Sequence, residues 1–338
     1  MDSAHETFQL GPFTAPRLWT GLWQLSSNAW GTASVPKVRQ AMGRHVDRGY
    51  TAFADHYGSA EIIFGQFRAG LESPDKVLGA TKWCVFKSTT LSRESVENAV
   101  RQRMDRMRTQ RVDLLQFHWQ DYENRDYLKA IELLCELKNE GLIAAIGLCN
   151  FDSARTEEIC TKFPGMIVSN QVQFSLIDTR PLHGMAEVCI RHGVKLLTYG
   201  TLCGGFLADK YIGLPEPEPY SESGSLNPSQ RKYLDMILKA WGSWPIFQDL
   251  LHVLRDIGNR HGGLSVSNVA TRWVLDHPAV GAVIIGARLG CSEYPEDNAK
   301  VFGVSLTDRD REDIDAVLER SNGARLTETI GDCGAEYR

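Results

Sequence analysis

Three side chains that can move a proton stand where three successive apolar segments end. Tyr57 lies just beyond one segment, Lys82 closes the next and His118 follows the third. A lysine ammonium stabilises a phenolate, so a tyrosine beside it gives up its proton more readily. An imidazole nearby can hold a carbonyl oxygen in line. A single lysine at a strand end is more often a solvated charge, and a single histidine is more often a packing residue. The three residues together predict proton donation to a carbonyl oxygen.

The elements that would position these side chains alternate between strand-like and helix-like patterns. Pro36 begins and Gly49 ends one expected helix, and Ser92 with Ser95 opens another. Such alternation with short connections implies parallel strands, so the pattern predicts an α/β fold, a (β/α)8 TIM barrel, with a hairpin near residues 7–17 ahead of it. In that fold the active site forms at the carboxyl ends of the strands. The expected helices include 36–48, 92–108 and 126–140, and the expected strands are 18–23, 51–54, 77–82, 112–117, 143–148, 167–171, 194–198 and 281–285.

One connection is much longer than the others. About 80 residues separate the last two expected strands, more than one crossover needs. Its segment 213–248 holds a loop rich in proline, glutamate and serine, followed by Trp241 and Trp244. Two interpretations stay open: a functional lid at the catalytic rim, or a helical insertion with a solvated linker. Residues 321–338 are glycine-rich and polar, so a mobile tail is expected, and residues 1–338 are expected to form a single domain.

Bulk properties exclude several classes of function. The chain has 338 residues and a net charge of -5, which gives no electrostatic reason to bind nucleic acid or anionic lipid. It has no apolar run of about 20 residues for a membrane span and no secretory signal pattern. Its eight cysteines are scattered without a CxxC pair, so they are interpreted as reduced thiols of a cytoplasmic protein. The expected partner is therefore a small molecule, and no metal is expected.

Seven segments, in order along the chain, resemble those of the aldo-keto reductase superfamily. The resemblance covers nearly the whole chain and implies a single (β/α)8 barrel, NADPH bound across the strand tips, and hydride transfer to a carbonyl. The absence of a GxGxxG fingerprint agrees with a barrel rather than a Rossmann site. The segments are 54–58 (ADHYG), 81–82 (TK), 114–119 (LLQFHW), 147–151 (GLCNF), 170–173 (NQVQ, with Pro181 beyond), 197–200 (LTYG) and 285–288 (IGAR).

The resemblance also implies roles for individual residues. Tyr57 would be the general acid, Lys82 would tune it and His118 would orient the substrate. Arg288 favours NADPH over NADH, because a guanidinium binds a 2′-phosphate through a rigid fork. The expected cofactor contacts are Gly21, Leu22 and Trp23, Asn150 and Gln171 at the carboxamide, Tyr199 on the nicotinamide ring, Gly200, Thr201, Leu202 and Gly204 along the pyrophosphate, Gly286 and Arg288 at the adenosine phosphate, and Asn298 at the adenine.

Two positions depart from the family pattern. The family's catalytic aspartate stands five residues before the tyrosine, where this chain has Ala52, and the stretch leading to Tyr57 is about two residues shorter than usual. Asp55 could replace the carboxylate only with a rearranged backbone. Cys149 stands where a serine usually precedes Asn150, and a thiol is a weaker hydrogen-bond partner. A weakened proton relay is therefore expected. A non-redox enzyme (isomerisation, dehydration or cyclisation) and a cofactor-sensing regulatory subunit stay open as alternatives.

Aromatic residues are expected around the pocket. Trp23, Trp83 and Trp119 each follow a strand candidate, which predicts a bulky apolar or aromatic carbonyl substrate. The other interpretation is that these tryptophans only fill the top of the barrel. His56 is expected either to face the pocket or to lie in a helix interface.

Overall fold

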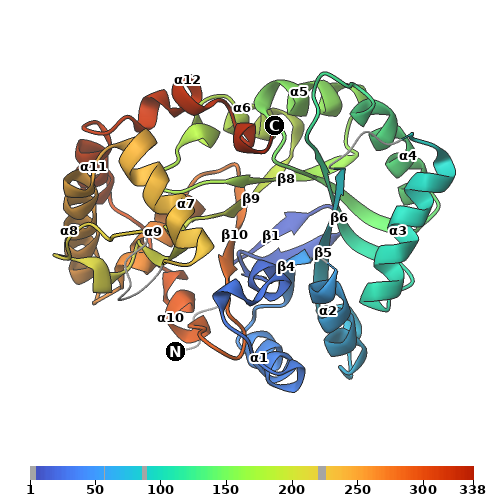
Figure 1. The fold of residues 1–338 in the computed structure, drawn as a ribbon, viewed down its shortest axis with the longest axis horizontal. Coiled ribbons are helices and arrows are strands. Elements are labelled where there is room, and N and C mark those ends of the chain that lie inside the picture. Colours follow the sequence, from blue (N-terminus) through green and yellow to red (C-terminus); the bar gives the residue numbers. More distant parts are fainter. Residues whose placement is uncertain (1–4, 57, 86–89, 220–225) are drawn as a thin grey trace.

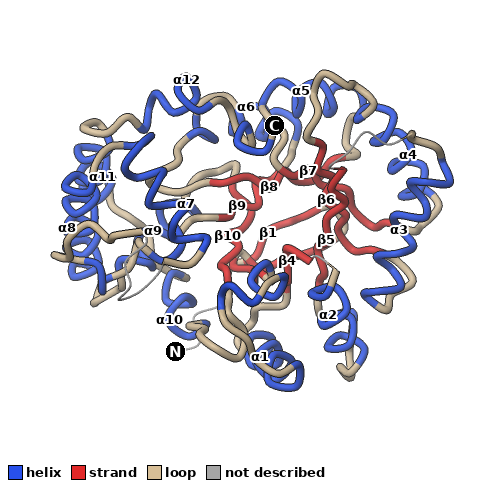
Figure 2. The backbone as a smooth tube through the Cα atoms, viewed as in Figure 1, coloured by secondary structure: helices blue, strands red, loops and turns tan. Residues whose placement is uncertain are grey.

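A closed barrel of eight parallel strands forms the centre of the molecule, and helices surround it (Figures 1 and 2). The computed structural model describes residues 5–56, 58–85, 90–219 and 226–338. The strand order around the barrel is β10-β3-β4-β5-β6-β7-β8-β9, so the predicted (β/α)8 fold is confirmed. The barrel strands are β3 (Leu18–Gly21), β4 (Ala52–His56), β5 (Leu78–Val85), β6 (Val112–Trp119), β7 (Ile143–Cys149), β8 (Ile167–Gln173), β9 (Lys195–Tyr199) and β10 (Val280–Gly286).

The helices begin and end where local sequence signals stand. Pro36 lies in the first turn of α1, and Ser92 and Ser95 form a reciprocal capping box at the start of α3. Within the described ranges no helix has the length and apolar character to cross a membrane. The helices are α1 (Val35–Asp47), α2 (Ser59–Ala69), α3 (Arg93–Met107), α4 (Tyr127–Asn139), α5 (Ser153–Lys162), α6 (Met185–His192), α7 (Pro228–Asp235), α8 (Trp244–Arg260), α9 (Val266–Leu275), α10 (Pro295–Asn298), α11 (Asp308–Leu318) and α12 (Leu326–Ile330).

The predicted hairpin precedes the barrel. β1 (Thr7–Leu10) pairs with β2 (Phe13–Pro16) in an antiparallel register. Leu10 and Ala15 are buried in one apolar cluster with side chains from inside the barrel. Arg17 donates to the carbonyl oxygens of Leu275, Val280 and Gly281 near the start of β10. The hairpin thus packs against the interior from the amino ends of the strands.

Alternation along the strands decides which side chains face the barrel interior. Successive residues of a strand point to opposite faces, so every second residue belongs to the same side. In β5 the side chains of Ala80, Lys82 and Cys84 therefore face the interior. In β6 those of Leu114 and His118 do so. The apolar interior cluster includes Trp19, Ala52, Ala54, Leu78, Ala80, Leu114, Ala145, Leu197, Ala282 and Ile284.

Two segments outside the regular repeat lie near the barrel mouth. The connection from β9 to β10 contains α7, the π-helical turn η7 (Met236–Trp241), α8 and α9, and both Trp241 and Trp244 are buried in the main core. The segment expected as a mobile tail forms η9 (Gly323–Arg325), α12 and η10 (Ala335–Tyr337). Leu326 and Cys333 of this segment are buried, because they pack into the same core. Figure 1 shows the C-terminus close to α5 and α6.

Candidate active site

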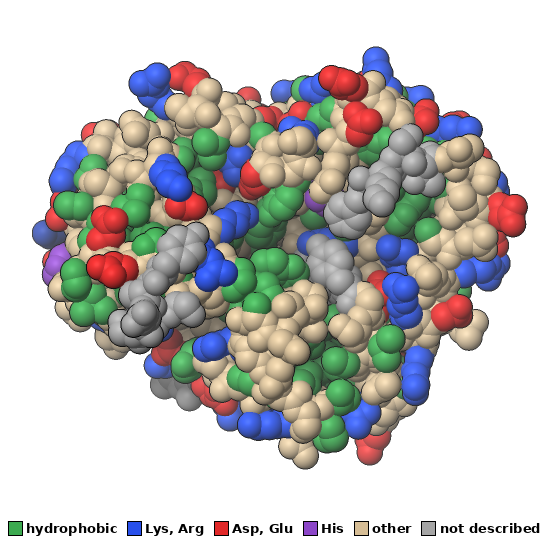
Figure 3. All heavy atoms as spheres, viewed as in Figure 1, with side chains coloured by type: hydrophobic (Ala, Val, Ile, Leu, Met, Phe, Trp, Pro, Cys, Tyr) green, Lys and Arg blue, Asp and Glu red, His purple; other side chains and the backbone are tan. Residues whose placement is uncertain are grey.

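Lys82 and His118 lie on neighbouring strands at the carboxyl end of the barrel. The β5–β6 register pairs Lys82 with Gln116, and Cys84 with His118. Both Lys82 and His118 face the interior and are buried. The structure therefore brings these two predicted residues together. The face on which the C-terminal segment and α7 lie is hollowed at its centre, with hydrophobic side chains along the hollow (Figure 3).

The backbone at Lys82 is held from outside the barrel. Arg103 of α3 donates Nε to the Lys82 carbonyl oxygen at 2.8 Å. The neighbouring Thr81 hydroxyl donates to Oε1 of Glu61 at 2.5 Å, and Arg106 donates to Oε2 of Glu61 at 3.0 Å. Glu61 itself is only 1% exposed. Helices α2 and α3 thus fix the part of β5 that carries Lys82 through a buried polar network.

Tyr57 lies outside the described residues, as do the side chains of Asp55 and His56. The backbone of β4 reaches His56, which pairs with Thr81, one residue before Lys82. The register shifts between Phe53 and His56, where β4 takes three residue steps while β5 takes two, so β4 carries one extra residue at this point. The roles of these three residues stay predictions.

Ala52 lies deep in the barrel, far below the level of Lys82. It pairs with Leu78, four residues before Lys82, and is fully buried in the apolar interior cluster. Four strand residues span about 13 Å. A carboxylate at position 52 would therefore face alanine and leucine side chains rather than the Lys82 ammonium.

His118 is held in its neutral form. Burial, together with the positive charges of Lys82 and Arg338, lowers its pKa to about 4. Its Nδ1 lies 3.8 Å from Sγ of Cys84, on the next strand. A neutral imidazole carries one hydrogen, so the group beside Nδ1 influences whether Nε2 is a donor or an acceptor. The arrangement suits an imidazole that holds an oxygen rather than one that carries charge.

Asn150, Gln171 and Tyr199 come from three consecutive strands. Asn150 follows β7 with φ of 58° and donates its backbone N–H to the Gln171 carbonyl oxygen at 2.9 Å. The Tyr199 hydroxyl donates to Oδ1 of Asn150 at 2.9 Å. Burial raises the pKa of Tyr199 well above its ordinary value. These predicted nicotinamide contacts therefore form one connected group, with Cys149 buried next to Asn150.

The loop after β9 fits a diphosphate. Gly200 has φ of 74°, and a Cβ there would lie 2.1 Å from Oη of Tyr233, so only glycine fits. Within the described ranges, the N–H groups of Thr201 and Leu202 donate to no backbone carbonyl. Free N–H groups in such a turn form a concavity that binds anions. Gly204 lies against α7, because a Cβ there would lie 3.0 Å from the backbone of Ser229.

The predicted adenosine-phosphate residues lie at the rim. Gly286 pairs with Gly21 where β10 and β3 end, and both Gly286 and Arg288 are exposed. Arg288 forms no ion pair with any described residue, so its guanidinium suits a phosphate. Asn298 is half-buried at the end of α10.

Leu22 and Trp23, which follow β3, can meet a cofactor in different ways. The Leu22 side chain is buried in an outer cluster with Val38 and Phe53, so only its backbone could meet a cofactor. Trp23 is 41% exposed, with its ring 4.6 Å from that of Trp30. In the described part of the chain no three His, Cys, Asp or Glu side chains gather as a metal site.

A sequence profile of the Aldo/keto reductase family matches residues 17–319. The chain belongs to the aldo/keto reductase family. Its members are NADP-dependent oxidoreductases, and NADPH is their cofactor. Aldo-keto reductase YhdN of Bacillus subtilis is 26% identical over 321 residues, and the alignment covers 91% of this chain and 91% of the relative. The chloroplastic pyridoxal reductase of Arabidopsis thaliana is 25% identical over 334 residues, covering 93% of this chain and 86% of the relative.

Solved structures share the fold of this aldo-keto reductase. The glycerol dehydrogenase AKR11B4 from Gluconobacter oxydans aligns with a TM-score of 0.74 at 23% identity, covering 94% of this chain and 96% of the other. An aldo/keto reductase from Klebsiella pneumoniae, in complex with NADP and acetate, aligns with a TM-score of 0.69 at 19% identity, covering 93% and 96%. At these identities, the two alignments show a shared barrel fold.

Two predicted substrate residues of this aldo-keto reductase lie on the wrong side of the barrel wall. Trp83 and Trp119 alternate with Lys82 and His118, and both are buried in the main core. Both rings pack against Phe117, with centroids 5.2 and 5.9 Å away. Trp83 and Trp119 therefore fill space between strands and helices, and the prediction that they line the pocket is wrong.

Residues that the sequence analysis did not single out also reach the site. Tyr337 and Arg338, from the segment expected as a mobile tail, contact His118 and Asn150, and Lys232 of α7 contacts Tyr199. The one sequence signal is the aromatic and basic pair that ends a glycine-rich stretch. Nothing local indicates where that pair docks, because the hydroxyl and the ammonium that contact Tyr337 belong to residues more than 100 positions away.

Proposed function

We propose that this aldo-keto reductase reduces a carbonyl group of a small molecule with NADPH, using Tyr57 as the general acid. The observation that carries this proposal is the buried pair Lys82 and His118, which lie on neighbouring strands near the carboxyl end of the barrel. The loop after β9, with its available N–H groups, supports a diphosphate beside them. We also propose that the chain forms a single barrel domain and that residues 213–248 are an insertion at its rim.

The residues divide the chemistry between them. NADPH, when bound, supplies the hydride. Tyr57 donates a proton to the carbonyl oxygen, and the Lys82 ammonium stabilises the phenolate that remains. His118, neutral because burial lowers its pKa to about 4, donates a hydrogen bond to the same oxygen through Nε2. Asn150 and Gln171, both buried, would hold the carboxamide of the bound cofactor.

The substrate preference rests on fewer residues than the sequence suggested. Trp83 and Trp119 pack outside the barrel, so Trp23 is the tryptophan of the three that supports an apolar or aromatic substrate. Its exposed ring lies at the mouth after β3. We therefore propose an aldehyde or ketone with one apolar face rather than one fully enclosed by aromatic side chains.

The test is NADPH oxidation with a panel of aromatic and aliphatic aldehydes. Wild type should consume NADPH, whereas Tyr57→Phe and Lys82→Met should lose turnover by at least about a hundredfold, the usual share of general acid catalysis. NADPH binding, measured separately, should survive in both variants. NADPH binding without turnover would favour a cofactor-sensing subunit, and turnover without NADPH consumption would favour a non-redox enzyme.

A further inference from the structure

The C-terminal segment, residues 331–338, lies on side chains that the nicotinamide end of the cofactor would use. Oη of Tyr337 is 3.2 Å from Oη of Tyr199, which in turn donates to Asn150. The Tyr337 ring meets the His118 imidazole edge to face, with centroids 5.7 Å apart. One aromatic side chain thus contacts both the proposed substrate-orienting histidine and the proposed stacking tyrosine.

Lys232 adds a cation at the same place. Its Nζ donates to Oη of Tyr337 at 3.1 Å. The same Nζ lies 5.7 Å from the ring centroid of Tyr199 and 5.4 Å from that of Tyr233. Aromatic faces attract cations, so this ammonium is stabilised there. Lys232 of α7 thus lies over the Tyr199 ring, and Tyr337 of the C-terminal segment contacts its hydroxyl, at the residue expected to stack on nicotinamide.

The backbone of Asn150 is covered as well. Gly334 approaches so closely that a Cβ there would lie 2.1 Å from the Asn150 carbonyl oxygen, and its φ is 76°. Arg338 donates Nη2 to the same oxygen at 3.0 Å. The Arg338 guanidinium also lies 4.2 Å from the ring centroid of Tyr122. The contact therefore depends on a glycine at 334, because any side chain would push the segment off Asn150.

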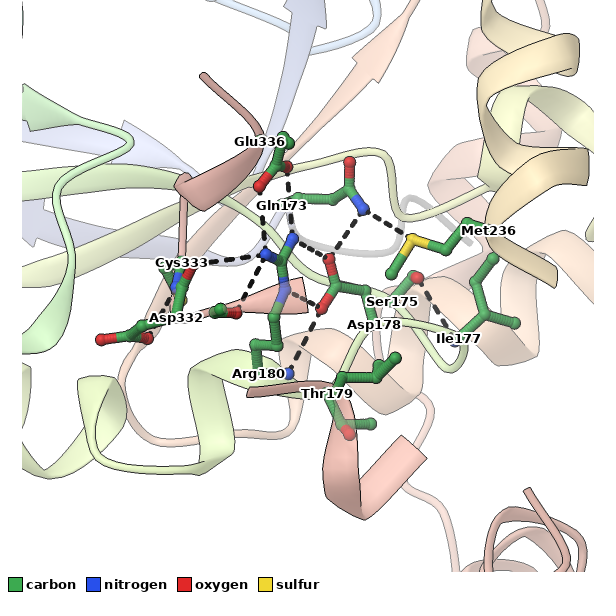
Figure 4. A network of polar contacts seen from close by, with 12 residues as sticks. Gln173, Ser175, Ile177, Asp178, Thr179, Arg180, Met236, Asp332, Cys333 and Glu336 are labelled. Carbon is green, nitrogen blue, oxygen red and sulfur yellow. Dashed lines mark hydrogen bonds and ion pairs between the residues drawn. The ribbon is translucent and has the colours of Figure 1, made fainter. Parts of the chain in front are cut away.

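A buried ion-pair network holds the segment in place (Figure 4). Arg180, 1% exposed, donates Nε and Nη2 to the two carboxylate oxygens of Asp178, each at 2.8 Å. It also donates to Glu336 at 3.0 and 3.2 Å and to the carbonyl oxygens of Gly331 and Asp332 at 3.4 and 3.3 Å. Charge-assisted bonds of this kind fix one geometry. Removing the Glu336 carboxylate would loosen the segment while Asp178 keeps Arg180 paired.

We propose that residues 331–338 form an autoinhibitory strap that competes with the nicotinamide end of NADPH and is displaced when the cofactor enters. Within the described ranges, the strap makes no hydrogen bond or ion pair to loop 200–205 or to Arg288. In this proposal the adenosine and diphosphate end binds first, because the strap has no polar contact with the described residues there to break, and the strap yields to the nicotinamide afterwards. Competition of this kind weakens the apparent affinity by the fraction of molecules with the strap released.

The test compares NADPH binding to the full chain and to two strap variants, by quenching of tryptophan fluorescence. Gly334→Ala places a methyl against the Asn150 carbonyl, and Glu336→Gln removes one carboxylate from Arg180. Gly303→Ala is the matched control, because Gly303 also has a positive φ, 74°, but nothing within 4 Å of its added Cβ. Both strap variants should lower the Kd for NADPH by at least about threefold, and the control should not change it.

A ligand without nicotinamide separates the strap from the rest of the groove. The Kd of 2′,5′-ADP, which carries only the adenosine and its phosphates, should be the same in all four proteins. In wild type, saturating NADPH should accelerate amide hydrogen exchange in residues 331–338, and 2′,5′-ADP should leave it unchanged.

Three results would overturn the proposal. One is unchanged or weaker NADPH binding in both strap variants. Another is slower exchange of residues 331–338 on NADPH binding, which would show a segment that closes over the cofactor. The third is no NADPH binding in any form of the protein. None of these readouts requires carbonyl turnover, so a wrong substrate assignment does not affect them.

Discussion

The thiol of Cys84 lies beside the imidazole of His118, with Sγ and Nδ1 3.8 Å apart across the β5–β6 pair. Both side chains face the interior at the barrel mouth, and burial lowers the pKa of His118 to about 4, so the ring is neutral. A thiol that donates to Nδ1 leaves the ring hydrogen on Nε2, which is the form that can donate to a carbonyl oxygen.

Replacing Cys84 should therefore weaken orientation of the substrate rather than binding of the cofactor. Cys84→Val removes the donor, and a hydrogen bond worth about 0.5–1.5 kcal/mol corresponds to a loss of about two- to tenfold in kcat/KM. Cys84→Ser, which keeps a donor, should retain most of the activity. Steady-state kinetics with a fixed aldehyde measures both, and Cys135→Val on α4 is the control. Equal losses in the valine and serine variants would contradict this role for the thiol.

An aspartate at position 52 should harm the protein rather than restore a relay. Ala52 pairs with Leu78 and is fully buried among apolar side chains. An unpaired buried carboxylate costs about 3 kcal/mol or more, so Ala52→Asp should lower the urea midpoint strongly without raising the reductase rate. Ala52→Val, which adds volume without charge, separates the cost of size from that of the carboxylate. A gain in rate for Ala52→Asp would show that its carboxylate reaches Lys82.

The barrel and the strand order follow from the sequence because apolar segments alternate with capped helices along nearly the whole chain. Strand ends are harder to predict. The polar tip of β5 looked like its end, yet Lys82, Trp83 and Cys84 remain hydrogen-bonded to β6. Pairing rather than hydrophobicity decides where a barrel strand stops. The same alternation that turns Lys82 inward turns Trp83 outward, so the position of that tryptophan was available from the pattern.

The C-terminal segment was not predictable from its own composition. A glycine-rich, polar stretch indicates mobility, but Arg180 lies about 150 residues earlier and supplies its anchor. A buried arginine satisfied by two carboxylates is a non-local feature, and no spacing rule connects Asp178 to Glu336. The sequence predicts the position of the site through Lys82 and His118, whereas only the folded structure shows which residues cover it.

Acid should destabilise the protein partly through His118. The folded-state pKa is about 4, below the ordinary value of about 6.5, so below pH 6.5 the unfolded chain takes up a proton that the folded chain refuses. Stability therefore falls as pH drops from 6.5 towards 4, by about 2 kcal/mol between pH 7 and pH 5 from this group alone. Urea unfolding at both pH values measures the loss, which should be smaller in His118→Gln.

His277 supplies the control for this measurement. Burial lowers its pKa to about 4 as well, but it packs against Phe174 and Trp273, among the helices. His277→Gln should change the pH dependence of stability in the same direction and to a similar extent, because the two pKa values are lowered alike. Only His118→Gln should also reduce kcat/KM. A loss of turnover in both variants would mean that stability, not the imidazole at the site, limits activity.

Arg288 should discriminate NADPH from NADH. It is exposed beside Gly286, and no described carboxylate neutralises it. A charged hydrogen bond contributes about 1.5–3 kcal/mol, so Arg288→Leu should raise the Kd for NADPH by about ten- to a hundredfold and leave that for NADH nearly unchanged. Arg309→Leu, at the exposed start of α11, is the matched control. Equal weakening of both cofactors would place the 2′-phosphate elsewhere.

A hydrogen bond across the barrel mouth should control how fast the cofactor enters and leaves. Nε1 of Trp30, in η2 (Asn28–Trp30), donates to Oγ of Ser229 at the start of α7, 3.2 Å away, and α7 also presses on Gly204. Trp30→Phe keeps the ring and removes the donor. Stopped-flow fluorescence should show NADPH association and dissociation both accelerated by about two- to tenfold, with Kd changed little.

Ser229→Ala removes the other half of the same bond, so the double variant should be no faster than either single one. Additive effects would mean that the two residues act on cofactor exchange separately and that the bridge does not gate the groove.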